Sequence, residues 1–134
     1  LGAGEMLALQ DRVAEADRAL HEAIARAMEA GDATTEARAW FVLATLAFDQ
    51  GRSKDGHDAL LESMALYRDL DTREGRLGLA QATRTYGEHL AVLGSASDAR
   101  EALRLARAMY DALGDTAAVA GIDADLATVA GFAR

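Results

Sequence analysis

The chain has 134 residues and a formal net charge of −8, with 51% hydrophobic residues, 5% aromatic residues, no cysteine and no proline. The acidic balance argues against nucleic-acid binding, which depends on phosphate neutralisation, and the lack of cysteine excludes disulfides, thiolate metal sites and cysteine nucleophiles. Proline disrupts helices while Ala, Leu, Arg and Glu favour them, so we predict one all-α domain over residues 1–134.

Three helices are predicted in the first half of the chain. The first runs over about residues 4–30, with apolar side chains at helical spacing: Val13, Ala16, Leu20, Ile24 and Met28. Gly31 ends it, and Asp32 is placed to cap the second helix. The second helix stops at Gly51, because glycine adopts the left-handed conformation at low cost. The third helix spans roughly residues 53–70.

Three more helices are predicted in the second half. Asp71 and Glu74 have the spacing of a capping box at the start of the fourth helix. Ser95 and Asp98 repeat that signal for the fifth, and Asp115 caps the sixth, which reaches the C-terminus. Loops of only a few residues predict that neighbouring helices lie antiparallel.

Residues 51–70 and 94–113 nearly repeat each other. Aligned without a gap, they share seven identities at an interval of 43 residues: Gly51/Gly94, Asp55/Asp98, Ala59/Ala102, Leu60/Leu103, Ala65/Ala108, Tyr67/Tyr110 and Leu70/Leu113. Helices two and three therefore form one sequence repeat, and helices four and five form a second. The sixth helix starts a third repeat.

This pattern resembles the tetratricopeptide repeat, in which small residues let two helix backbones approach and large residues fill the space beside them. Ala44 and Gly87 are the small residues here, and Trp40, Leu60 and Leu103 are the large ones. The resemblance implies a right-handed superhelix, a solenoid of about six helices stacked as antiparallel pairs. It also implies a non-catalytic module that binds a protein or peptide, of the long-repeat type found in bacterial transcription regulation and signalling.

The chain departs from the family pattern in three ways. Its interval of 43 residues exceeds the usual ~34, and the closing proline of the repeat is missing. The first repeat opens with an aromatic residue, Trp40, but the matching positions in the later repeats hold Thr83 and Asp123. A HEAT-like array, with a period of ~40–47 residues, and a plain six-helix bundle therefore remain as alternatives.

The resemblance also implies a partner-binding groove lined by the first helix of each repeat. Carried over by position, the groove consists of Arg38, Phe41, Thr45, Phe48, Gln81, Arg84, Glu88, Thr128 and Phe132. Phe41 and Phe48 lie off the apolar stripe of their helix, so they are either exposed anchors or core residues. Arg38 and Arg84 either pair with an acidic ligand or form salt bridges with neighbouring glutamates such as Glu88.

No enzymatic or metal-binding pattern is found. His21, His57 and His89 lie on different predicted helices and form no ligand pair. Asp123 and Asp125 are two residues apart, so on a helix they diverge by about 200° and cannot share a metal. We therefore predict no catalytic residue, no metal and no cofactor.

The two ends of the chain suggest further contacts. The first helix is long, and the chain stops after a helix of the first type without its partner. We expect that the sequence is a fragment of a larger protein, that the terminal helices are buried in a homodimer, or both. No apolar run reaches the ~18 residues of a spanning helix, so we expect a cytoplasmic protein without membrane contact. A homo-oligomerisation module and a small-ligand sensor are the alternatives to protein binding.

Overall fold

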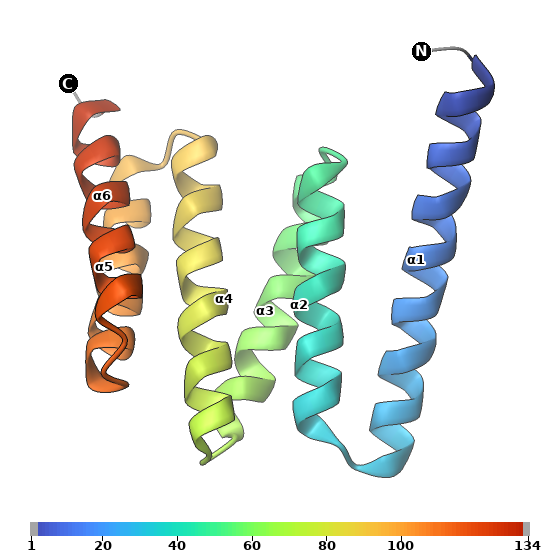
Figure 1. Ribbon diagram of the computed structural model, residues 1–134, viewed down its shortest axis with the longest axis horizontal. Helices are drawn as coiled ribbons and strands as arrows, with labels where there is room; N and C mark the ends of the chain where they lie inside the picture. Colours follow the sequence, from blue (N-terminus) through green and yellow to red (C-terminus); the bar gives the residue numbers. More distant parts are fainter. Residues whose placement is uncertain (1–2, 133–134) are drawn as a thin grey trace. The chain divides into compact units, whose positions relative to one another are not determined.

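The computed structural model describes the backbone of residues 3–132 and the side chains of residues 9–129. Residues 3–132 form six α-helices and no strand (Figure 1). Their bounds are α1 Ala3–Ala30, α2 Ala33–Asp49, α3 Ser53–Asp69, α4 Arg73–Val92, α5 Ala96–Ala112 and α6 Thr116–Phe132. Within the chain, α1 packs antiparallel to α2, α2 to α3, α4 to α5 and α5 to α6, so the predicted all-α class and helix order are confirmed.

The chain divides into two compact units, Leu1–Leu66 and Tyr67–Arg134. The boundary falls near the end of α3. The first unit therefore holds α1, α2 and most of α3, and the second holds the last turn of α3 with α4, α5 and α6. Each unit is described by itself.

Local turn chemistry explains most helix ends. The Asp32 carboxylate accepts a hydrogen bond from the backbone N–H of Thr35 at 3.1 Å, and Asp115 accepts one from Ala118 at 3.0 Å. Both predicted caps are confirmed. Gly51, with a φ of 75°, closes the turn after α2 in the left-handed conformation that only glycine adopts freely.

The predicted capping box at the start of α4 is wrong. Thr72 is the N-cap, and its hydroxyl accepts the backbone N–H of Gly75 at 2.9 Å. Asp71 stands one residue too early to reach the first turn, and its exposed carboxylate lies 3.4 Å from the guanidinium of Arg76. Ser95 occupies the N-cap of α5 but makes no side-chain capping bond.

The internal repeat is reproduced in the helices. Both ends of α5 lie 43 residues after the corresponding ends of α3, and α6 begins 43 residues after α4. Leu60 and its counterpart Leu103 are both fully buried, and Tyr67 and Tyr110 are 6% and 5% exposed. The two copies therefore share helix bounds as well as inward-facing side chains.

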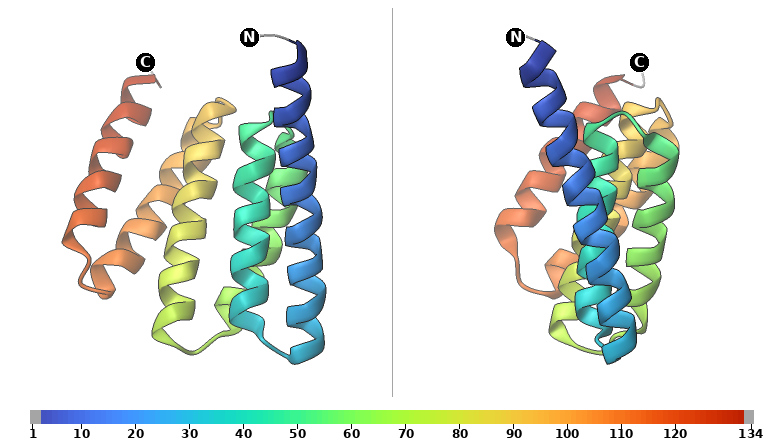
Figure 2. Two further views of the ribbon diagram at one scale, coloured as in Figure 1. Left: turned by 45° about the vertical axis from the view of Figure 1, so that its right-hand side comes forward. Right: turned by 90° about the vertical axis from the view of Figure 1, so that its right-hand side faces the viewer.

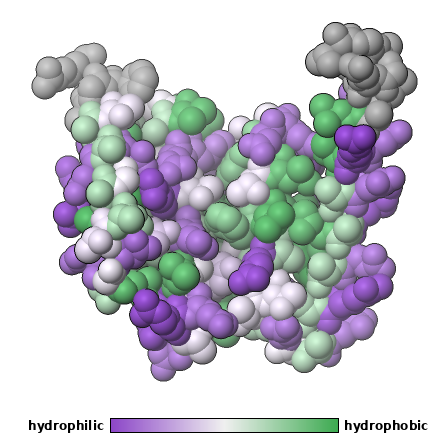
Figure 3. Space-filling view, in the orientation of Figure 1, coloured by the Kyte–Doolittle hydropathy of each residue, from purple (hydrophilic) through white to green (hydrophobic). Residues whose placement is uncertain are grey.

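In the first unit, α2 lies between α1 and α3 (Figures 1 and 2). The buried hydroxyl of Ser63 on α3 donates a hydrogen bond to the carbonyl oxygen of Ala37 on α2 at 2.8 Å. The ring of Phe48 lies directly against Gly56, where any side chain would overlap it. Figure 3 shows hydrophobic side chains gathered over α2 and the side of α1 that faces it.

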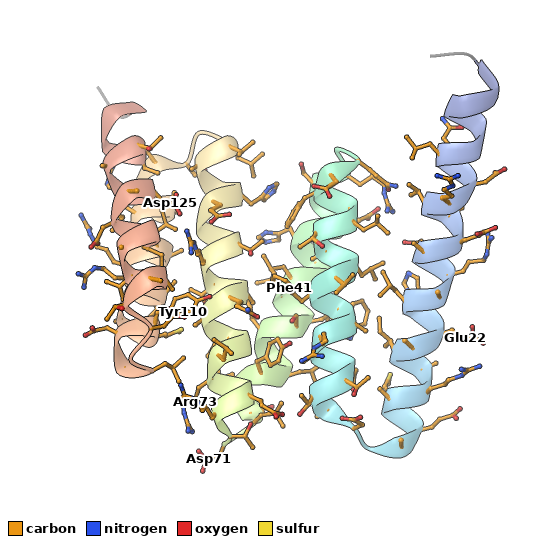
Figure 4. All side chains as sticks on the ribbon, in the orientation of Figure 1. Glu22, Phe41, Asp71, Arg73, Tyr110 and Asp125 are labelled. Carbon is orange, nitrogen blue, oxygen red and sulfur yellow. The ribbon has the colours of Figure 1, made fainter. Side chains whose placement is uncertain are left out.

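In the second unit, α5 packs against both α4 and α6 around a core of small, branched and aromatic residues: Ala80, Ala99, Leu103, Ala106, Tyr110, Ile122 and Val129. A Cβ at Gly87 would lie 2.8 Å from the Cγ of Leu103, so α4 and α5 can approach this closely only with glycine there. The guanidinium of Arg73 reaches the α5–α6 turn and donates to the carbonyl oxygen of Leu113 at 3.3 Å (Figure 4). This bond satisfies a carbonyl at the end of α5.

Among the described residues, no helix combines the length and the hydropathy needed to cross a bilayer.

Gly78→Ala should destabilise the fold by roughly 1–3 kcal/mol, because the new methyl group would overlap the buried ring of Tyr67. Gly121→Ala, 43 residues later, is the matched control, since a Cβ there meets only the far end of the long Arg84 side chain, its Nη2 at 2.9 Å, and no buried ring. Helix propensity favours alanine at both positions by up to ~1 kcal/mol. Urea unfolding followed by circular dichroism would measure both changes, and equal effects would contradict the packing described.

Candidate functional site

The predicted groove residues on α2 lie in the first unit. Arg38 is exposed, whereas Phe41, Thr45 and Phe48 are half-buried (Figure 4 labels Phe41). The hydroxyl of Thr45 donates to the carbonyl oxygen of Val42 at 2.8 Å. Because one face of the Phe48 ring is covered by Gly56, that side chain is fixed in place by its own unit.

The predicted groove residues on α4 and α6 lie in the second unit. Gln81 is exposed, and the hydroxyl of Thr128 donates to the carbonyl oxygen of Ala124 at 3.1 Å. The side chain of Phe132 lies outside the described residues. The remaining two residues, Arg84 and Glu88, form a salt bridge at 3.1 Å.

A third charged group joins Arg84 and Glu88. Asp125 lies on the side of α6 that faces α4, and its carboxylate is 3.2 Å from the guanidinium of Arg84 (Figure 4). One guanidinium therefore holds two carboxylates from two helices. Asp123 points elsewhere and pairs with Arg107 at 2.6 Å, which confirms that Asp123 and Asp125 diverge.

Beside this charge cluster lies a cavity of about 600 Å³, which we call the α4–α6 cavity. It is lined by Glu88, Ala91, Val92, Gly94, Ala96, Leu103, Asp125, Thr128 and Val129. Two of these, Glu88 and Thr128, belong to the predicted groove. Most of the others are apolar, so the cavity joins a hydrophobic wall to a charged end.

The pKa of Glu88 is raised above its usual value of 4.5. Burial is the largest cause, the nearby charge of Asp125 adds to it, and Arg84 only partly opposes it. The charged end of the cavity is therefore short of positive charge when both carboxylates are ionised.

The first unit contains a second concave site, a cleft of about 440 Å³ that we call the acidic groove. It is lined by Asp17, His21, Trp40, Leu43, Ala47, Arg52, Asp55, Asp58, Ala59 and Glu62. The residues come from α1, α2, the α2–α3 turn and α3. The apolar ones belong to α2 and α3, and four carboxylates stand against one guanidinium.

Arg52 lies between two of these carboxylates, 3.7 Å from Asp17 and 3.4 Å from Asp55. The imidazole of His21 is 3.7 Å from Asp17 and meets the indole of Trp40 edge-on, with ring centroids 6.4 Å apart. These contacts position the aromatic and charged groups relative to one another. Lys54, which stands outside the groove, lies 3.4 Å from Asp58. The groove still keeps an excess of negative charge, because Arg52 and Lys54 together cannot neutralise four carboxylates.

The acidic groove was not predicted, although a sequence signal for it exists. Asp55, Asp58 and Glu62 have the spacing i, i+3, i+7, which places them on one face of α3. Asp17 and His21 are likewise one turn apart on α1. What the sequence does not show is that these two faces meet beside Trp40.

Within the described part of the chain, no group of three or more His, Asp or Glu side chains is arranged to hold a metal ion.

A scan against protein-family models and a search of the curated proteins both find no match for this chain. The two concave sites and the internal repeat are therefore the features from which a function can be inferred.

The raised pKa of Glu88 predicts a specific pH dependence. The folded chain binds the Glu88 proton more tightly than the unfolded chain, so this contribution to stability is fully present below pH 4.5 and is lost as the pH rises through the folded pKa. Relative to Glu88→Gln, the wild type should therefore lose stability as the pH rises from 4.5 through the raised pKa of the folded chain.

Urea unfolding of both proteins across that range would measure the difference. Glu101→Gln, which changes an exposed glutamate on α5, is the matched control. A wild type that gains stability relative to Glu88→Gln as the pH rises would contradict the assigned desolvation of Glu88.

Proposed function

We propose that the chain is a non-catalytic, tetratricopeptide-like solenoid module that binds a basic segment of a partner protein. The acidic groove of the first unit is the observation that carries this proposal. Its volume of about 440 Å³ lies within the ~300–1,000 Å³ typical of ligand sites. The internal repeat of antiparallel helix pairs supports the assignment to a helical-repeat module of a bacterial regulatory or signalling protein.

The chemistry of the acidic groove suits an arginine or lysine side chain. The aliphatic stem of such a residue can pack on Leu43 and Ala47. Its cationic head then lies among the carboxylates, and the face of Trp40 offers a cation–π contact. A guanidinium suits the site best, because it pairs with carboxylates through two parallel hydrogen bonds and also stacks on aromatic rings.

The charge of the whole chain acts in the same direction. A net charge of −8 attracts a basic segment at long range and repels acidic ones. Because the groove is open to solvent, this attraction should weaken as salt is added.

Binding of a basic peptide should change the fluorescence of Trp40, which is the single tryptophan of the chain and lines the acidic groove. The probe is a synthetic peptide of three arginines separated by glycine pairs, and the comparison is the same peptide with glutamates. Titration at low and high salt should show saturable binding of the arginine peptide that weakens with salt.

Two triple variants make the test specific to the groove. The groove variant is Asp55→Asn, Asp58→Asn and Glu62→Gln. The control variant, which changes exposed carboxylates of α1 outside the groove, is Asp11→Asn, Glu15→Gln and Glu29→Gln. Both alter the net charge equally, but only the groove variant should weaken binding by about tenfold, the combined size of several weak charge pairs. Equal weakening by both would show attraction without a site.

Self-association is a second candidate function, favoured by two large apolar side chains of α1. Leu9 and Met28 are 61% and 62% exposed. Burying them in a second copy of the chain would remove that apolar surface from water. Sedimentation equilibrium should then show a dimer that the double substitution Leu9→Ser with Met28→Ser dissociates, and a monomer at all concentrations would exclude this function.

A further inference from the structure

Arg52 is a cation that the chain itself places in the acidic groove. Its backbone N–H donates to the carbonyl oxygen of Ala47 at 2.9 Å, and its own carbonyl oxygen accepts the N–H of Gly56 at 3.0 Å. Both hydrogen bonds belong to the main chain, so they form with any side chain at this position except that of proline. The side chain of Arg52 can therefore move without disturbing the turn that carries it.

The guanidinium of Arg52 faces three acceptors that come from different elements. Its Nη2 lies 3.7 Å from Asp17 on α1, its Nη1 lies 3.4 Å from Asp55 on α3, and its Nε donates to the side-chain oxygen of Gln50 after α2 at 2.8 Å. The fixed fork of a guanidinium allows such a set of contacts, whereas the ammonium of lysine is a single point of charge. The groove therefore holds a binding place for the head of an arginine.

This place lies beside the aromatic side chain of the groove. The imidazole of His21 is 3.7 Å from Asp17 and meets the indole of Trp40 edge-on. Asp17 thus contacts both Arg52 and the ring that abuts Trp40. A cation here has carboxylate partners and an aromatic neighbour, the two features on which the proposed function depends.

The remaining carboxylates of the groove form a poorer place for a guanidinium. Asp58 and Glu62 both belong to α3, so they hold a cation from one helix only. Lys54 already lies 3.4 Å from Asp58. The best-formed place in the groove is therefore the one that Arg52 occupies.

Arg52 is held weakly enough to be displaced. Its side chain is 40% exposed, and those of Asp17 and Asp55 are 32% and 65% exposed. Ion pairs at such exposed positions contribute little, because water screens them and holding long side chains costs entropy. When another arginine replaces it, Arg52 becomes solvated and the two carboxylates keep a cationic partner.

We propose that Arg52 is a built-in competitor for the basic ligand of the acidic groove. An arginine of the bound segment displaces the Arg52 guanidinium from between Asp17 and Asp55, and Arg52 thereby limits the affinity of the groove. This inference rests on the proposed function. It adds which carboxylates hold the ligand and which residue opposes its binding.

The test compares Arg52→Gln with the wild type, using Trp40 fluorescence and the peptide of three arginines separated by glycine pairs. Without the competitor, the peptide should bind about fivefold more tightly, the combined effect of two exposed ion pairs. Arg12→Gln is the matched control, because it removes the same charge from an exposed arginine of α1 outside the groove. It should change the affinity much less than Arg52→Gln does.

A double-mutant cycle with Asp55→Asn tests the displacement itself. Asp55 is a carboxylate for which Arg52 and the ligand compete. Asp55→Asn should therefore weaken peptide binding more in the Arg52→Gln background than in the wild type, where it also weakens the competitor. Additive changes would show an effect of overall charge and would contradict displacement.

If Arg52→Gln does not fold, Arg52→Lys keeps the charge but loses the fork, and it should strengthen peptide binding to a smaller extent. Unchanged binding by the folded variant would overturn the inference and show that the ligand uses Asp58 and Glu62 alone. Weaker binding would also overturn it, since Arg52 would then support the groove. If neither the wild type nor the folded variant binds the peptide, the proposed function itself fails, and this outcome is distinct from the other two.

Discussion

Close approach of helix backbones at small residues is the constraint on which this structure depends. At Gly87 a single added carbon would collide with Leu103, and at Gly78 it would collide with Tyr67. Small residues remove the steric barrier, and the large residues opposite then fill the remaining space. Because both kinds recur every 43 residues, the helices form the same pairs twice.

The same constraint leaves clefts beside the paired helices. When the large side chains are used to join paired helices, the clefts beside them are lined by short residues such as Ala47, Ala59 and Ala91. Charged side chains then set the electrostatic character of each cleft. In the first unit four carboxylates surround an apolar floor, and in the second two carboxylates share one arginine.

Much of the fold could be predicted because its signals are local. Helical periodicity, glycine turns and aspartate caps predicted all six helices, and the internal repeat predicted which helices pair. The start of α4 was misplaced because Asp71 and Thr72 are both good caps, and only the backbone shows which one bonds to Gly75. The acidic groove could not be predicted from the tetratricopeptide resemblance. That resemblance concerns the first helix of each sequence repeat and says nothing of carboxylates on α1 and α3.

The environment of Phe48 shows where sequence reasoning stops. From its position in the predicted helix, Phe48 could be either a core residue or a surface residue, because the residue that it contacts belongs to another helix. Gly56 provides the space for the ring, but this follows only once α2 and α3 are placed side by side.

A double-mutant cycle between Gly87 and Leu103 tests the central claim most directly. Urea unfolding at equilibrium would be measured for Gly87→Ala, for Leu103→Ala and for the double variant. A Cβ at Gly87 would meet the Cγ and Cδ2 of Leu103 at 2.8 and 2.9 Å and its backbone nitrogen at 3.2 Å. Gly87→Ala should therefore cost more with leucine opposite than with alanine opposite, where only the backbone contact remains, a coupling of roughly 1–3 kcal/mol. Additive effects of the two substitutions would contradict the account.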